Sequence, residues 1–82
     1  MNIVTDFVIG VPTKTVIWYW CGTKDKRTVF GWSKNLWQAK IYKSYTSAGQ
    51  VITRYQNKDT NNFWKDAKYQ TIDEWKAEDP LI

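Results

Sequence analysis

The sequence predicts a small α+β fold in which a mostly antiparallel sheet is built on an aromatic β-hairpin, and three observations support this class. Residues 15–21 and 28–32 are rich in β-branched and aromatic side chains, and the polar stretch between them contains Gly22, as expected for two strands and a turn. Residues 45–56 have apolar side chains at helical spacing. A shorter helical pattern covers residues 33–40, so one main amphipathic helix and one short helix should pack on one side of the sheet.

The first arm of the hairpin, Thr15–Cys21, is apolar on both faces, because side chains alternate along a strand. One face carries Val16, Trp18 and Trp20, and the other carries Ile17, Tyr19 and Cys21. A strand of this kind is usually central in its sheet and covered on both sides. The alternative is that one face stays open as an aromatic platform for a partner, since large exposed apolar patches are usually functional.

Further strands are predicted at both ends of the chain. Residues 2–9 alternate in side-chain type and predict a first strand at an edge of the sheet. The following residues, 10–12, should end this strand, because Pro12 has no N–H to donate to a ladder. Residues 67–72 also alternate and predict a closing strand, and residues 41–43 predict a short β-like segment.

The short helix at residues 33–40 begins after a favourable N-cap residue, Ser33. Leu36 and Ala39 are three positions apart and should therefore face the core. Trp37 lies off this stripe, so we expect its ring to be partly exposed.

The main helix, from Tyr45 to about Gln56, follows a second N-cap candidate, Ser44. Its apolar stripe consists of Ala48, Val51, Ile52 and Tyr55. Gly49 should weaken this helix by up to ~1 kcal/mol relative to Ala, unless it permits close packing on the sheet.

The chain of 82 residues suffices for one small domain, residues 1–82, which ends in an acidic tail, 73–82. Six Trp, five Tyr and three Phe compensate for the thin core of a domain of this size, because each ring buries a large area. One Cys and no His exclude an intrachain disulfide, a zinc site of ordinary ligand type and a Ser-His-Asp or Cys-His catalytic group. We therefore predict no catalytic, cofactor-binding or metal-binding residue and no enzymatic activity.

The polar stretch 57–62 resembles the start of an EF-hand calcium loop in its spacing of Asn and Asp residues. Asn62 stands where that loop needs Gly, and Lys68 stands where it needs a bidentate Glu. Because Asn and Asp are also the common residues of turns, we interpret this stretch as a turn.

Cysteine use and the start of the chain predict a cytoplasmic location. Cys21 lies in the most apolar run, where it should be a small buried hydrophobe, and low cysteine use fits a reducing compartment. The first residues have no basic region and Asp6 interrupts their apolar run, so no signal peptide is expected. We also expect no membrane partner, because no stretch is long enough to span a bilayer.

The net charge of +4 is distributed unevenly. Residues 1–72 carry eleven Lys or Arg against four Asp or Glu, whereas residues 73–82 carry one Lys against four acidic residues. A basic body can attract nucleic acid or an acidic protein surface. The other interpretation is a solvated Lys-rich surface that keeps a small protein soluble.

Residues 15–55 resemble a class of small hypothetical proteins that are common in phages and prophages of Gram-positive bacteria. The resemblance consists of the aromatic hairpin followed by two sets of spaced residues. They are Ser33, Leu36, Ala39, Lys40, Tyr42, Lys43 and Ser44, and then Ala48, Val51 and Ile52. It implies a cytoplasmic accessory protein that binds a host or phage macromolecule, and it brings no catalytic motif.

The first functional hypothesis is a non-enzymatic protein that binds a host protein, for example to inhibit a host enzyme or a defence system such as CRISPR. Trp, Tyr and Arg dominate binding hot spots, and the chain has more Trp than a small core needs. The candidate partner-binding residues are Lys24, Lys26, Arg27, Trp37, Trp64 and Trp75. The other three tryptophans, Trp18, Trp20 and Trp32, are expected in the core.

Two alternatives stay open. Aromatic side chains beside Lys and Arg can bind single-stranded nucleic acid by stacking bases, which fits Trp18, Tyr19 and Trp20 next to the basic turn. An edge strand at either end of the chain could also pair with a second copy to form a homodimer.

Overall fold

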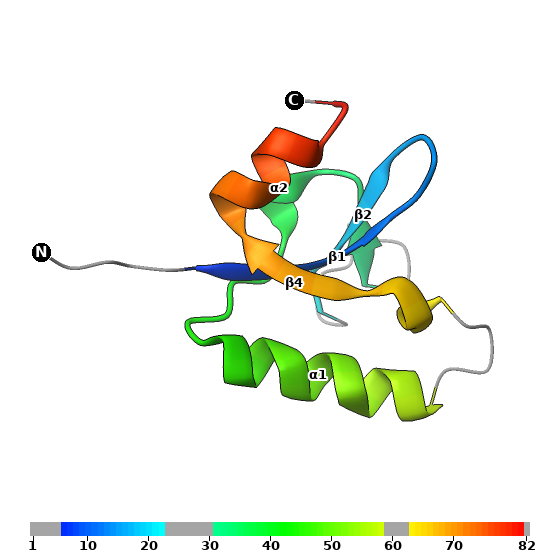
Figure 1. The fold of residues 1–82 in the computed structure, drawn as a ribbon, viewed down its shortest axis with the longest axis vertical. Helices are drawn as coiled ribbons and strands as arrows, with labels where there is room; N and C mark the ends of the chain where they lie inside the picture. Colours follow the sequence, from blue (N-terminus) through cyan, green and yellow to red (C-terminus); the bar gives the residue numbers. More distant parts are fainter. Residues whose placement is uncertain (1–5, 23–30, 59–62, 82) are drawn as a thin grey trace, which may run out of the picture.

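The computed structural model describes residues 6–22, 31–58 and 63–81. In this part of the chain, four strands form one antiparallel sheet in the order β3-β2-β1-β4. The strands are β1 (Phe7–Pro12), β2 (Ile17–Trp20), β3 (Trp32–Ser33) and β4 (Lys68–Thr71). The helices are α1 (Tyr45–Lys58) and α2 (Ile72–Glu78), with two 3-10 helices, η1 (Leu36–Gln38) and η2 (Trp64–Asp66). The predicted α+β class is confirmed, but the two predicted helices do not share one side of the sheet, because Leu36 of η1 packs with Trp75 whereas Ala48 and Ile52 of α1 belong to the other cluster. Figure 1 shows α1 and α2 on opposite sides of the sheet.

Strand β2 is central and apolar on both faces, as its sequence predicts. It pairs with β3 on one side and with β1 on the other, where Gly10 lies opposite Tyr19 and Val11 opposite Trp18. Directly opposed residues point to the same face, so Val11 and Trp18 face α1 whereas Gly10 and Tyr19 face α2. The sheet therefore separates two apolar clusters.

The larger cluster lies between the sheet and α1 and is rich in indole rings. Its buried members are Ile9, Val11, Trp20, Trp32, Tyr42, Ala48, Ile52 and Trp64. Trp20 is at its centre, with ring centroids of Trp32, Tyr55 and Trp64 at 5.2, 5.1 and 5.0 Å. These distances are typical of favourable aromatic pairs, so much of the aromatic surplus of the sequence is used inside the protein.

The smaller cluster lies on the α2 face and is built around Trp75, which is fully buried. The indole ring lies directly against the backbone of Gly10, where an added Cβ would come within 2.8 Å of two ring atoms. Tyr19 meets the same ring edge to face at 5.5 Å, and the indole Nε1 donates a hydrogen bond of 2.7 Å to the carbonyl of Val8. Gly10 therefore interrupts the apolar side chains of β1 to make room for the tryptophan of α2.

Helix α2 forms within the segment expected to be an acidic tail. Thr71 and Glu74 cap its start reciprocally: the Glu74 N–H donates to Thr71 Oγ1 at 3.2 Å, and the Thr71 N–H donates to Glu74 Oε1 at 3.0 Å. The backbone N–H of Thr71 is the main reason that the pKa of the Glu74 carboxyl is below its usual value. The acidic residues of the first turn also suit the positive end of the helix dipole.

The prediction of an N-terminal edge strand that ends before Gly10 is wrong. Strand β1 runs from Phe7 to Pro12 and lies between β2 and β4. Phe7 exchanges backbone hydrogen bonds with Tyr42 on the β2 side, so by strand alternation Pro12 directs its nitrogen to the other side. The pairing with β4 already ends at Gly10, and the missing N–H of Pro12 therefore costs no ladder bond.

The two predicted helical segments are found with small differences. Helix α1 extends two residues beyond the prediction, and the Ser44 hydroxyl accepts a hydrogen bond of 3.2 Å from the Ser47 N–H at its start. The short helix is the 3-10 helix η1, capped by Asn35, whereas Ser33, the predicted cap, belongs to β3. Leu36 is buried and Ala39 is half-buried, as predicted.

Candidate functional site

The six residues proposed from the sequence for partner binding do not form one surface. Trp37 is exposed, with 66% of its surface accessible, as expected from its position in η1. Trp64 and Trp75 are buried, so the prediction that they contact a partner needs correction. Trp64 stacks on Tyr55 at 4.6 Å, and Trp75 fills the space above Gly10. The three basic candidates, Lys24, Lys26 and Arg27, lie outside the described residues.

Trp37 lies beside a shallow hollow of about 290 Å³ that also includes Lys34 and Leu81. The Lys76 ammonium lies 4.9 Å from the Trp37 ring centroid, a cation–π distance. Asp79 is buried in this hollow, and its carboxylate accepts one hydrogen bond of 2.6 Å from the Tyr19 hydroxyl and another of 2.8 Å from the Leu81 N–H. Both carboxylate oxygens therefore hold the C-terminal segment in place.

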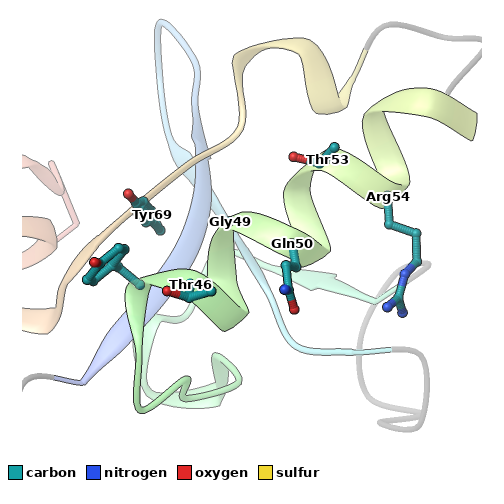
Figure 2. Close-up of a pocket in the computed structure, with 7 residues that line it drawn as sticks. Thr46, Gly49, Gln50, Thr53, Arg54 and Tyr69 are labelled. Carbon is teal, nitrogen blue, oxygen red and sulfur yellow. The ribbon is translucent and has the colours of Figure 1, made fainter.

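A larger groove of about 560 Å³ lies between α1 and the edge strand β4. It is lined by Tyr45, Thr46, Gly49, Gln50, Thr53 and Arg54 of the helix and by Tyr69 of the strand. Figure 2 shows Gly49 in the middle of these residues, with Gln50 and Arg54 projecting from one side of α1 and Thr53 from the other. An added Cβ at Gly49 would meet no atom within 4 Å, so the groove is open above this residue.

One end of the groove is aromatic. The rings of Tyr45 and Tyr69 lie 6.5 Å apart at an interplanar angle of 30°, and 62% and 37% of their surfaces are exposed. Both rings contact the half-buried Phe7, at 6.3 and 5.8 Å. Both tyrosine rings therefore pack against Phe7 and against each other, and part of each ring remains exposed. Rings of this kind offer a large contact area at a low cost in conformational entropy.

The backbone of Tyr69 is directed outward at the edge of the sheet. Val8 pairs with Gln70 and Gly10 pairs with Lys68, and these residues of β1 direct their backbone groups toward β4. Strand alternation then turns the N–H and the C=O of Tyr69 away from β1. The next outward N–H, that of Thr71, donates to the Glu74 carboxylate, which closes the edge at that point.

The charge of the groove is positive. Arg54 is the single charged residue in its lining, and α1 also carries Lys58 near its end but contains no Asp or Glu. Together these features give a groove with an aromatic end, an open floor at Gly49, an outward-facing backbone at Tyr69 and a cation at the far end.

Sequence reasoning missed the main members of this groove. Tyr45 and Tyr69 were given no exposed role, although Tyr45 lies off the apolar stripe of the helix, which is a signal of exposure. The sequence predicts that Gly49 weakens the helix unless it permits close packing on the sheet. No atom lies within 4 Å of a Cβ added at Gly49, so this residue does not serve close packing, and it lies at the floor of the groove instead. Nothing in the sequence indicates that β4 and α1 lie side by side.

Within the described residues, no three His, Cys, Asp or Glu side chains lie close enough to hold a metal ion. In residues 6–22, 31–58 and 63–81 there is also no helix with the length and apolar character needed to cross a membrane. Comparisons with protein-family models, with curated proteins and with solved structures found no significant match.

Proposed function

We propose that this protein is a non-enzymatic binding module that recognises another protein through the groove between α1 and β4. The observation that supports this proposal is the combination of two adjacent, exposed tyrosines with an open floor above Gly49. Aromatic residues and arginine are enriched where protein interfaces gain most of their energy. The resemblance to phage proteins implies a host or phage macromolecule as the partner, and we favour a host protein, for example a host enzyme or a defence system that this protein inhibits.

The chemical groups that line the groove also favour binding over catalysis. The groups with perturbed pKa values are Tyr19, Tyr42 and Glu74, and none of them lines the groove. The first two are buried hydroxyls whose pKa values are raised mainly by burial, and the third caps α2. Active sites usually bring such groups into a cleft, whereas this groove contains aromatic, hydroxyl, amide and guanidinium groups.

Single-stranded nucleic acid is the alternative occupant, because Tyr45 and Tyr69 could stack on bases. A nucleic-acid groove normally places several cations along the phosphate backbone. This groove has Arg54 alone in its lining. It also lies beside the outward-facing backbone of Tyr69, which suits a polypeptide. We therefore favour a protein partner.

The test is selection of binding peptides from a displayed random library, with the wild-type protein as bait. Gly49→Leu fills the groove from its floor and replaces glycine by a better helix former, so the fold should be kept. We expect selected peptides to bind Gly49→Leu at least about tenfold more weakly than wild type, a loss of about 1.4 kcal/mol.

The matched control is Asn57→Leu, which adds the same side chain to an exposed position of α1 outside the groove. It should leave peptide binding unchanged. If no peptide is enriched, or if Gly49→Leu binds as well as wild type, the groove is not the binding site. Salt-sensitive binding of oligothymidylate that Gly49→Leu abolishes would instead support the nucleic-acid alternative.

A further inference from the structure

Helix α1 has an outward face that consists of exposed, hydrogen-bonding side chains. At 3.6 residues per turn, this face lies opposite Ala48 and Ile52, the two buried residues of the helix. Its members are Thr46, Gln50, Arg54 and Asn57, and all four are exposed. Figure 1 shows the other labelled elements on one side of α1, so the outward face is open to a partner.

Two residues of the outward face are poor choices for an exposed helix. Thr and Asn have lower helix propensities than Ala, Lys or Glu, and at exposed positions no packing makes up for the difference. Thr46 and Asn57 therefore lower the intrinsic stability of α1. A local preference that is broken with no gain in packing is a sign of a functional position.

The charge around α1 has a single sign. Residues 31–58 contain four Lys and one Arg but no Asp or Glu, whereas a merely solvated surface usually carries both signs. Among the described residues, four of the six acidic side chains belong to α2 or directly follow it, on the other side of the sheet, namely Asp73, Glu74, Glu78 and Asp79. The other two are Asp6, which pairs with Lys43 at 2.8 Å, and Asp66 in η2. This distribution of charge suits an anionic partner.

Three cations lie beside or within the outward face. Arg54 and Lys58 are one helical turn apart and both are exposed. The Lys40 ammonium lies 5.6 Å from the ring centroid of Tyr42. Burial raises the pKa of Tyr42, and the charge of Arg54 offsets part of this rise, so Arg54 is near the same residue. Within the described residues, none of these three cations forms an ion pair, and they can therefore pair with phosphates.

We propose that the outward face of α1 binds the major groove of double-stranded DNA, where Gln50 and Asn57 contact base edges. Lys40, Arg54 and Lys58 contact the phosphates. This inference goes beyond the proposed function, because it concerns another face of α1 and another class of partner. An α-helix with its side chains fits the major groove of B-DNA, which is about 12 Å wide. The major groove of an RNA duplex is too narrow for a helix.

The two amides are the reason to expect contacts with bases. Gln50 and Asn57 are seven residues apart, so they lie about two turns apart along one line of the helix. An amide side chain offers a donor and an acceptor that match the major-groove edge of adenine. An acidic protein could also pair with the cations, but a protein interface normally has an apolar core, and the outward face contains no apolar residue. DNA is therefore the favoured partner.

Selection from a library of random DNA duplexes, with the wild-type protein as bait, tests this proposal. Fluorescence anisotropy then measures the affinity for an enriched duplex. With three cations on phosphates, the affinity should fall about 40-fold between 50 and 200 mM salt. Arg54→Glu should weaken binding at least about tenfold. The control Lys14→Glu makes the same change of charge at an exposed residue of the β1–β2 connection, which Figure 1 shows far from α1, and should leave binding unchanged.

A modified base tests the contacts in the major groove. Replacing adenine by 7-deazaadenine removes an acceptor from the major-groove edge and leaves the phosphates unchanged. At a contacted adenine it should weaken wild-type binding about tenfold. Asn57→Leu should itself bind the enriched duplex about tenfold more weakly and should no longer respond to the modified base at the position that Asn57 contacts. Leu is a better helix former than Asn, so the fold should be kept.

The outcomes separate this proposal from the proposed function. Asn57→Leu should weaken DNA binding and leave peptide binding unchanged, whereas Tyr45→Ala, which changes the groove, should do the reverse. If no duplex is enriched, or if duplex RNA or oligothymidylate binds as tightly as the enriched duplex, the major-groove proposal is wrong and the binding function of the groove stands. The proposal is also wrong if 7-deazaadenine has no effect at any position. Binding of polyglutamate by a protein that enriches no duplex would assign the outward face to an acidic protein instead.

Discussion

On the α2 face of the sheet a single tryptophan, Trp75, is held by directed contacts: a hydrogen bond to Val8, an edge-to-face contact with Tyr19 and a close approach to Gly10. On the α1 face Trp20, Trp32 and Trp64 pack ring against ring, and Gln56 donates a hydrogen bond of 3.0 Å to the Trp64 carbonyl. The α2 face is therefore covered by one tryptophan with specific contacts, and the α1 face by a cluster of several aromatic rings. The second face also continues to the surface, where Tyr45 and Tyr69 remain exposed.

This difference indicates how stability and binding are divided in the molecule. On the α2 face, hydrogen bonds satisfy the buried polar atoms of Trp75 and Tyr19. On the α1 face, the aromatic cluster continues through Phe7 to the exposed rings of Tyr45 and Tyr69.

The largest loss of folding stability is expected for Trp75→Ala. Truncation of a fully buried tryptophan removes its contacts and leaves a cavity, which typically costs about 3–5 kcal/mol. For a domain of this size, that loss is a large part of the total stability. Urea denaturation followed by circular dichroism measures it. Trp37→Ala, at an exposed ring, is the control and should change the free energy of unfolding by less than about 0.5 kcal/mol.

The second effect is expected for Gly10→Ala, which places a methyl group 2.8 Å from the Trp75 ring. Overpacking of this kind should cost about 2 kcal/mol. The smaller ring of Trp75→Phe should reduce the cost of Gly10→Ala, and a double-mutant cycle measures that coupling. Strictly additive costs would show that Gly10 and Trp75 do not share the contact that closes the α2 face.

The third predicted loss of folding stability is that of Tyr19→Phe, and its size should depend on pH. The hydroxyl donates to the buried Asp79, so its removal should cost about 1–3 kcal/mol near pH 8. Burial, and then the hydrogen bond and the charge of Asp79, raise the pKa of Tyr19 above its ordinary value of 10.0. Above pH 10 the unfolded chain therefore loses this proton before the folded protein does, and the wild type loses stability as the pH rises.

Tyr19→Phe lacks this ionisation, so the stability gap between the variant and the wild type should become smaller between pH 8 and pH 10.5. Urea midpoints of both proteins at the two pH values measure the change. Tyr45→Phe, at an exposed ring, is the control and should differ little from the wild type at pH 8. A gap of constant size would contradict a raised Tyr19 pKa.

The smallest expected change in folding stability is a gain, for Gly49→Ala. Gly49→Ala adds a methyl group where no atom lies within 4 Å, so the helix should gain about 0.5–1 kcal/mol. The same chemical change therefore destabilises the α2 face at Gly10 and stabilises the α1 face at Gly49. Thermal unfolding measures both. If Gly49→Ala lowers the melting temperature, the floor of the groove is in contact with another part of the chain.

Much of the fold could be predicted from local patterns. The two-sided apolar character of β2 indicated a central strand with both faces covered, and the spacing of Ala48, Val51, Ile52 and Tyr55 indicated α1. The exposure of Trp37 followed from its place beside Leu36 in a helical turn. In each case the period of the side chains alone decides which of them face the core.

Helix α2 was missed although its start carries a capping-box sequence, Thr71-x-x-Glu74. The acidic composition of residues 73–82 suggested a solvated tail, and a single Trp75 gave no helical stripe. Its burial depends on Gly10, a residue 65 positions earlier in the chain, whose missing side chain leaves room for the ring. Such a pairing of a large and a small residue cannot be recognised before the two elements are placed together.

The class of fold and the strand and helix patterns depend on residue types and on side-chain periodicity within short segments, so they can be read from the amino-acid sequence alone. Only the tertiary structure shows which tryptophans are buried, which strand lies at the edge of the sheet beside α1, and where the groove lies. These properties depend on how distant elements meet, since both the burial of a ring and the outward direction of a backbone amide are set by neighbours that are remote in the chain.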